Sequence, residues 1–214
     1  MRILSVTIVC AFVLFLSIGA IKRYAYHQLI TLLENKEYAR FDRLIDSKRM
    51  KLLFPKLVLL DMKLNASLLR QDKAQSIQWI EEICHLPLTS SQKETYYLKA
   101  FNFYVGIEDK KNSKKYLDLI QKGSNEKMKV ETRRVYNIYI DKNDHDLKDL
   151  IKELDDMEED QKGIHEFLIS KIYANKKDPV NARKYEQLSK EHLALIDSRT
   201  SEKKLAHPTP NKHK

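Results

Sequence analysis

The seven histidines of this chain are the first residues to examine for chemistry, because imidazole binds metals and exchanges protons near neutral pH. A zinc-protease helix requires two histidines four positions apart, and no two histidines here have that spacing. His165-Glu166 begins such a motif, but Phe, Leu and Ile follow it. Cys84 stands beside His85 with no further soft ligand close in sequence, so we interpret it as a packed core thiol.

Two acidic segments resemble ion-binding sites at first sight. The run from Asp141 to Asp146 begins like a calcium loop, but Asp146 replaces its sixth-position Gly and Lys152 its twelfth-position Glu. This run therefore predicts a turn between helices. The acidic stretch from Glu153 to Asp160 is interpreted as a solvated helix face and the loop after it. Without a Gly-rich phosphate cradle or a serine nucleophile elbow, the sequence predicts no cofactor, no metal and no catalysis.

The formal net charge of +9 raises the question of nucleic-acid binding. Basic residues are spread over all the predicted helices together with Asp and Glu, and part of the excess lies near the C-terminus, at Arg199, Lys203, Lys204, Lys212 and Lys214. This distribution favours solvated helix faces and a basic tail over a nucleic-acid surface, so no nucleic-acid partner is expected.

An uncharged segment, Ile3 to Ile21, begins the chain and is followed at once by Lys22 and Arg23. At ~1.5 Å per residue, a helix of this length spans roughly 28 Å, close to the hydrocarbon thickness of a bilayer. We therefore expect residues 1–23 to form a transmembrane anchor whose partner is the lipid bilayer. The alternative is a cleaved signal peptide with Ala20 before the cut, although the apolar run is longer than such peptides require.

The basic flank indicates the orientation of this single-pass anchor. Only Arg2 precedes the span, whereas Lys22, Arg23, Lys36 and Arg40 follow it closely. The positive-inside rule therefore predicts that the rest of the chain lies in the cytoplasm. An outward-facing or secreted protein that assists secretion or envelope assembly stays open as an alternative.

The elements after Arg23 are predicted to be amphipathic helices, because apolar residues recur there at spacings of three and four. One such stripe comprises Ile164, Phe167, Leu168 and Ile172. The chain has only four Gly and five Pro, which also favours an all-α fold. A loose repeat begins at five residues, Ala39, Ser76, Ser113, Asp146 and Ala182. The spacings between them are 37, 37, 33 and 36 residues. Such a period is typical of helix-turn-helix solenoids.

This pattern resembles the tetratricopeptide family. In two repeats a small residue is followed by an aromatic one, as in Ser113 with Tyr116 and Ala182 with Tyr185. Small residues also stand near the close-packing position of the first helix, at Ala66, Ala100 and Ala174. The family's first-helix Trp and Leu-Gly pair are absent. The resemblance implies about five antiparallel helix pairs over residues 24–196, followed by a disordered basic tail at 197–214; a simple helical bundle is the alternative.

A solenoid of this family implies a concave groove on the first helix of each pair, where polar residues interrupt the apolar stripe. The candidate partner-groove residues are Lys63, Asn65, Tyr97, Asn102, Arg133, Asn137 and Lys171. The sequence thus predicts a membrane-anchored, non-enzymatic scaffold or adaptor that binds a peptide or protein partner. An enzyme with an unrecognised site is the alternative from another class.

Overall fold

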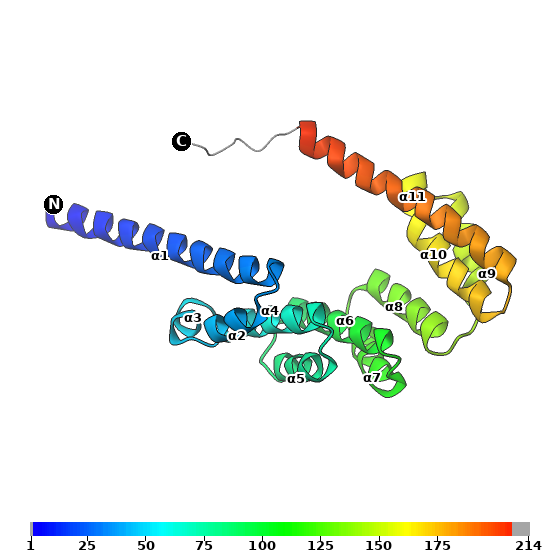
Figure 1. Ribbon diagram of the computed structural model, residues 1–214, viewed down its shortest axis with the longest axis horizontal. Coiled ribbons are helices and arrows are strands. Elements are labelled where there is room, and N and C mark those ends of the chain that lie inside the picture. The colour runs from blue at the N-terminus through cyan, green and yellow to red at the C-terminus, as the bar shows by residue number, and fades with distance from the viewer. Residues whose placement is uncertain (1, 207–214) are drawn as a thin grey trace. The chain divides into compact units, whose positions relative to one another are not determined.

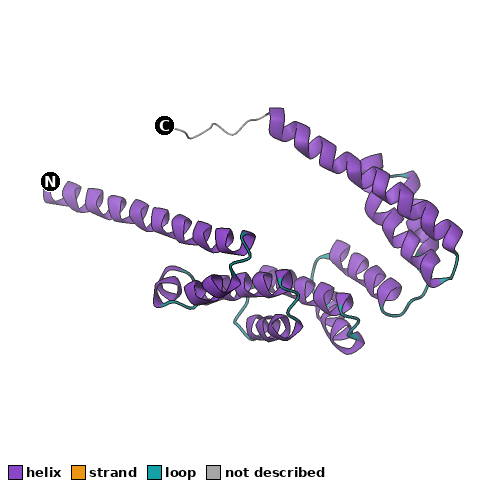
Figure 2. Cartoon of the chain, viewed as in Figure 1, coloured by secondary structure: helices purple, strands orange, loops and turns teal. Residues whose placement is uncertain are grey.

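The computed structural model describes the backbone of residues 2–206 and the side chains of residues 17–159 and 161–195. The described residues form eleven α-helices and no strand (Figures 1 and 2), which confirms the all-α prediction. The helices are α1 (Arg2–Glu34), α2 (Tyr38–Ile45), α3 (Lys48–Leu53), α4 (Lys56–Leu69), α5 (Lys73–Cys84), α6 (Ser90–Gly106), α7 (Lys110–Gln121), α8 (Glu126–Tyr139), α9 (Leu147–Asp155), α10 (Glu159–Asn175) and α11 (Pro179–Ala206).

The chain divides into two compact units, Met1–Thr89 and Ser90–Lys214. The N-terminal unit contains α1 to α5 and the C-terminal unit contains α6 to α11. The boundary lies inside the segment 24–196 that the sequence predicts to be one repeat domain.

Short turns join five pairs of consecutive helices: α1 with α2, α4 with α5, α6 with α7, α8 with α9, and α10 with α11. Each turn holds one non-glycine residue in the left-handed region, with φ between 52° and 58°, namely Lys36, Gln71, Glu108, Lys142 and Lys177. These residues are 35, 37, 34 and 35 positions apart. The period agrees with the predicted repeat, so the fold is compatible with a helical-repeat architecture.

Three of these turns share an aspartate that both ends the first helix and caps the second. Its carboxylate accepts the N–H three residues ahead at distances of 3.0, 2.9 and 3.1 Å, in Asp72, Asp109 and Asp178. Its own N–H donates to a carbonyl of the preceding helix at 2.9, 2.9 and 3.0 Å, in Ser67, Tyr104 and Tyr173. In these three turns, a single aspartate therefore determines where one helix ends and the next begins.

The small residues that mark the repeat have mixed outcomes. Ser76 and Ser113 are buried near the start of α5 and α7, and Ala66 and Ala100 are buried on α4 and α6. Close packing at these positions is therefore confirmed. Ala174 is exposed, so the prediction of close packing is wrong there.

The core of the N-terminal unit joins α1 to the three helices that follow it. Its buried residues come from α1, α2, α3 and α4, and include Ala25, Leu29, Phe41, Met50 and Ala66. Ala25 and Leu29 belong to the same helix that contains Lys22 and Arg23. No loop therefore separates the basic flank of the predicted anchor from the packed core.

In the C-terminal unit, α10 buries a different face from the predicted one. Ile164 and Phe167 are 62% and 39% exposed, so their assignment to a buried stripe is wrong. The reason is close packing of α10 on α11, because a Cβ on Gly163 would lie 2.7 Å from the Leu193 side chain. That face also buries Glu166, whose carboxylate lies 2.7 Å from His192. Polar side chains that hydropathy would place on the surface are thus buried on this face.

The two ends of the chain are the segments that the sequence predicts to be an anchor and a tail. Within the residues that the structure describes, no helix combines the length and hydropathy of a membrane span. Residues 3–16 of the predicted anchor lie outside the described side chains. α11 continues through Ala206, into the segment predicted as a tail, and residues 207–214 lie outside the described residues.

Candidate functional site

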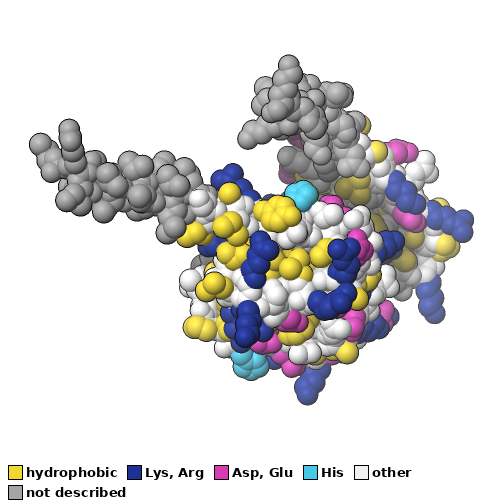
Figure 3. All heavy atoms as spheres, turned by 60° about the vertical axis from the view of Figure 1, so that its left-hand side comes forward, with side chains coloured by type: hydrophobic (Ala, Val, Ile, Leu, Met, Phe, Trp, Pro, Cys, Tyr) yellow, Lys and Arg dark blue, Asp and Glu magenta, His cyan; other side chains and the backbone are white. Residues whose placement is uncertain are grey.

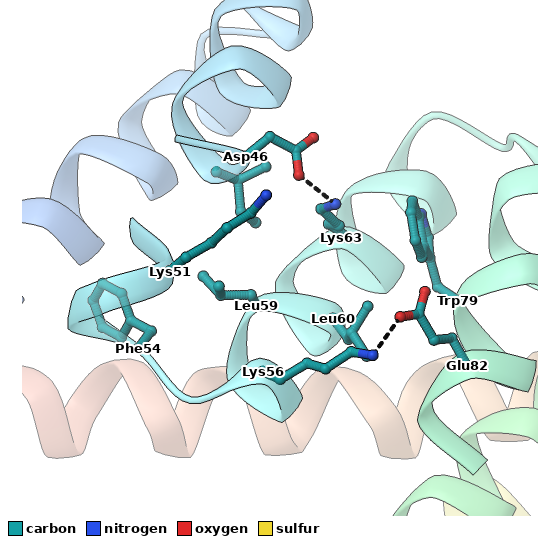
Figure 4. Close-up of a pocket in the computed structure, with 10 residues that line it drawn as sticks. Asp46, Lys51, Phe54, Lys56, Leu59, Leu60, Lys63, Trp79 and Glu82 are labelled. Atoms are coloured by element: carbon teal, nitrogen blue, oxygen red, sulfur yellow. Dashed lines mark hydrogen bonds and ion pairs between the residues drawn. The ribbon is translucent and has the colours of Figure 1, made fainter. Parts of the chain in front are cut away.

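The N-terminal unit contains a pocket of about 400 Å³ between α2, α3, α4 and α5 (Figure 4). Its apolar lining consists of Ile45, Phe54, Leu59, Leu60 and Trp79. Its charged lining consists of Asp46, Lys51, Lys56, Lys63 and Glu82. These ten residues are called the Trp79 pocket below. Its volume lies in the range of small-ligand and side-chain binding pockets.

The repeat that contributes Trp79 lacks an aromatic ring that two other repeats have. In α6/α7, Tyr104 stacks on Tyr116 at 5.5 Å between ring centroids, and in α10/α11 Tyr173 stacks on Tyr185 at 5.7 Å. Counted from the left-handed turn residue, the equivalent pair in α4/α5 is Ser67 and Trp79.

Ser67 is small and buried, and its hydroxyl lies 2.9 Å from that of Ser76. It presents no ring to the other helix. None of the described aromatic rings stacks on Trp79. The indole is therefore left to line a hollow.

Two ion pairs flank Trp79. The Lys63 ammonium lies 2.7 Å from Asp46 and 4.5 Å from the centroid of the Trp79 ring, which is a cation–π geometry. Lys56 pairs with Glu82 at 2.9 Å. Figure 4 shows both pairs at the edge of the pocket. Each acidic residue of the lining is thus neutralised by a lysine from α4.

Lys51 is the remaining cation of the lining. It is exposed at the end of α3, and it makes no ion pair with any described residue. In Figure 4 its side chain extends along the pocket, on the side of Asp46 and Lys63. The pocket therefore combines an apolar floor with one uncompensated positive charge.

A second hollow of about 110 Å³ continues from the Trp79 pocket and shares Asp46, Lys63 and Trp79 with it. Here Arg70, the residue that follows α4, donates two hydrogen bonds to the Asp42 carboxylate, at 2.7 and 2.9 Å. Its guanidinium also lies 4.6 Å from the Tyr38 ring centroid. Asp42 and Asp46 are one turn apart on α2, so two ion pairs fix α2 against α4 and hold the pocket wall in place.

The lining offers an apolar surface beside one unpaired cation. An aliphatic or aromatic side chain fits the apolar lining, and a carboxylate beside it reaches the Lys51 ammonium. Among the described residues, no group of three or more His, Cys, Asp or Glu is arranged to hold a metal ion. The lining thus matches an apolar group that has an anionic group next to it.

Of the predicted groove residues in the N-terminal unit, the structure places one in the pocket. Lys63 lines it and contacts Trp79. Asn65 is exposed, and its amide donates to Asp61 at 3.4 Å, outside the lining. The two residues are two positions apart on α4 and therefore lie on different faces of the helix.

The five predicted groove residues of the C-terminal unit do not share one pocket. Tyr97 lines a hollow of about 350 Å³ and lies 6.0 Å from Tyr116 between ring centroids. Asn102 is exposed, and Lys171 lies 4.8 Å from the Phe167 ring. The other two bond within the unit, Arg133 to Gln121 at 2.5 Å and Asn137 to Asp146 at 2.9 Å.

The main ion-pair network of the C-terminal unit joins α8, α9 and α10. Arg134 donates to both carboxylate oxygens of Glu153, at 2.5 and 2.8 Å, and the His165 Nε2 lies 2.9 Å from Glu153. The hydrogen bonds from Arg134 hold the pKa of Glu153 below its ordinary value. This network is structural, because it ties three helices together.

Sequence reasoning missed most of the Trp79 pocket. Neither Trp79 nor Lys51 is among the residues to which the sequence assigns a functional role. A signal was present in the sequence, because aligning the repeats places Ser67 opposite Trp79 where two other repeats have a tyrosine pair. The repeat alignment thus identifies the hairpin with a missing ring.

Lys22 and Arg23, the predicted anchor flanks, are both exposed on α1. Compared with protein families, with curated proteins and with solved structures, the chain gives no match in any of the three.

Proposed function

We propose that this protein is a membrane-anchored adaptor, similar to tetratricopeptide proteins, that binds a peptide segment of a partner protein in the Trp79 pocket without catalysis. The segment carries a large apolar side chain next to a carboxylate. The observation that carries the proposal is the pairing of an unstacked Trp79 with an unpaired Lys51 in one pocket of about 400 Å³.

The anchor is supported by the sequence and by the continuity of α1. Ile3 to Ile21 is uncharged and long enough for a bilayer. α1 runs through Lys22 and Arg23 to the buried Ala25 and Leu29. Such a connection keeps the pocket near the membrane and raises the effective concentration of membrane-associated partners. The positive flank favours a cytoplasmic location for the domain.

The peptide proposal is tested by calorimetry on the full chain in detergent micelles. The probe is a short peptide with one leucine or phenylalanine flanked by aspartates, and its counterpart has lysines in place of the aspartates. We expect saturable binding of the acidic peptide alone. The Lys51→Glu variant should weaken it about 10- to 100-fold, the value of a charge-assisted hydrogen bond.

Lys48→Glu is the matched control, because Lys48 is exposed on the same helix but does not line the pocket. It should bind the acidic peptide like the unaltered chain. Equal weakening by the two substitutions would show that the peptide senses only the general charge of the unit, and the proposal would then be rejected.

The anchor is tested separately by alkaline extraction of membranes. We expect the full chain to stay in the lipid fraction, since a hydrophobic helix resists extraction and a peripheral protein does not. Release of the intact chain into the soluble fraction would contradict the anchor. A C-terminal reporter that is active only in the cytoplasm would report the orientation.

A further inference from the structure

A second, more basic groove lies between α1 and α2 in the same unit. It has a volume of about 760 Å³ and is lined on α1 by His27 and Thr31. On the other side it is lined by Arg40, Arg43 and Arg49. Figure 3 shows Lys and Arg side chains in dark blue over the face of the protein that this view brings forward, with yellow hydrophobic side chains between them. This groove is called the α1/α2 groove below.

Most of its positive charge is not neutralised. Arg40 pairs with Glu37, the one acidic residue of the groove lining. Arg43 donates its Nε hydrogen to the Ala39 carbonyl at 3.3 Å, which leaves its other N–H donors for a ligand. Arg49 is exposed and makes no ion pair with a described residue. Two guanidinium groups therefore face the groove without an internal anion.

The position of the groove on α1 indicates what fills it. His27 is six residues beyond Ile21, which is roughly 9 Å along a helix, and Thr31 is roughly 15 Å beyond it. The polar headgroup layer extends about 5 to 8 Å beyond the hydrocarbon core on each side. Arg23 lies one turn before His27 on the same face of α1. The α1 side of the groove thus lies just beyond the headgroup layer, where long arginine side chains can extend back toward the headgroups.

We infer that the α1/α2 groove binds the phosphate of an anionic phospholipid headgroup in the bilayer that holds the anchor. Guanidinium groups suit this ligand, because their fork of donors matches phosphate oxygens in a bidentate manner. The inference rests on the proposed membrane anchor, which would bring the groove close to the headgroups. Binding there would fix the rotation of the domain about α1 and favour anionic regions of the membrane.

The test is native mass spectrometry of the full chain from micelles doped with equal amounts of phosphatidylglycerol and phosphatidylcholine. We expect preferential retention of phosphatidylglycerol by the unaltered chain. The triple variant Arg40→Gln, Arg43→Gln and Arg49→Gln should bind it on the order of 100-fold more weakly, at roughly fivefold per basic residue. These arginines are exposed, so the variant should fold, which circular dichroism checks.

The matched control removes the same charge from the C-terminal unit, by Lys111→Gln, Lys122→Gln and Lys148→Gln. All three lysines are exposed. This control should retain phosphatidylglycerol, and equal loss in both triple variants would overturn the inference. Displacement of the lipid by the same concentration of inorganic phosphate, or by a single-stranded oligonucleotide, would overturn the lipid as ligand.

Failure of the anchor is distinguished by alkaline extraction from vesicles of phosphatidylcholine alone. There the triple variant and the unaltered chain should both stay with the lipid, because the apolar segment does not need the arginines. Release of both chains would contradict the anchor whatever the mass spectra show. Retention of both, together with equal phosphatidylglycerol binding, would contradict the headgroup site alone.

Discussion

At the residue scale, Arg70 helps to hold in place the wall of the pocket that Trp79 lines. Arg70 makes a bidentate pair with Asp42 and stacks over Tyr38, although its Nε is buried without a partner. An arginine is required for this geometry, since lysine has a single donor group and no planar face. Arg70 therefore sets the distance between α2 and α4, and with it the width of the pocket.

We expect Arg70→Lys to lower the free energy of unfolding of the N-terminal unit by about 1 to 2 kcal/mol, because one of two charge-assisted bonds and the stacking are lost. Urea unfolding followed by Trp79 emission measures this directly, since Trp79 is the sole tryptophan and belongs to this unit. Arg49→Lys is the control and should leave the midpoint unchanged. An unchanged midpoint for Arg70→Lys would mean that the pair contributes nothing.

The second prediction at this scale concerns Glu153 and pH. Because folding lowers the pKa of Glu153, its stabilisation is complete above the ordinary value of 4.5 and is lost as the pH falls through the lower folded-state value. Glu153→Gln should cost about 1 kcal/mol at neutral pH, a figure reduced for solvent screening. The cost should disappear in acid.

Denaturant titrations of both chains at neutral and acidic pH measure this difference. Glu158→Gln is the control, because Glu158 is exposed and makes no ion pair with a described residue. A cost of Glu153→Gln that is the same at both pH values would contradict the role of the Arg134 hydrogen bonds.

At the scale of the helices, the sequence predicts the turns between them but only some of the faces that they bury. The turn from Asp141 to Asp146 follows from local residue preferences, and the structure confirms it. The spacing of the turns is compatible with the predicted repeat period. The buried face of α10 could not be predicted, since it is set by Gly163 and by the Glu166–His192 contact with α11. Hydropathy alone places Glu166 outside.

The close approach of α10 and α11 gives a prediction for glycine substitutions. Gly163→Ala should destabilise the C-terminal unit by about 1 to 3 kcal/mol, because its new Cβ would overlap Leu193. Gly106→Ala is the matched control, since nothing lies within 4 Å of its new Cβ. It should stabilise the unit by up to about 1 kcal/mol through helix propensity. Thermal unfolding of both variants checks the opposite signs.

The left-handed turn residues give the second prediction at this scale. Gln71 has φ 56°, a conformation that is costly for a residue with a Cβ. Gln71→Gly should therefore raise the stability of the N-terminal unit by up to about 1 kcal/mol. Lys73→Gly, two residues on and inside α5, should lower it by about 0.5 to 1 kcal/mol. Equal effects of the two substitutions in urea unfolding would show that the turn is not strained.

At the scale of the whole molecule, α1 unites the two proposed activities. It leads from the apolar segment through the α1/α2 groove into the core, which also supports the Trp79 pocket. The sequence predicted a helical platform, an anchor and one residue of the Trp79 pocket, Lys63, but not the α1/α2 groove. The Trp79 pocket and the α1/α2 groove depend on which residues of different helices lie next to each other. The spacing of apolar residues along the sequence does not contain that information.

The central claim is that the Trp79 pocket binds an acidic, apolar peptide while the chain is held in a membrane. The most direct test is the emission of Trp79 in the full chain reconstituted into phosphatidylcholine vesicles and titrated with the aspartate-flanked peptide. We predict a saturable shift to shorter wavelength that the lysine-flanked peptide does not produce and that Lys51→Glu weakens. Unchanged emission at saturating peptide, or the same shift with both peptides, would contradict the claim.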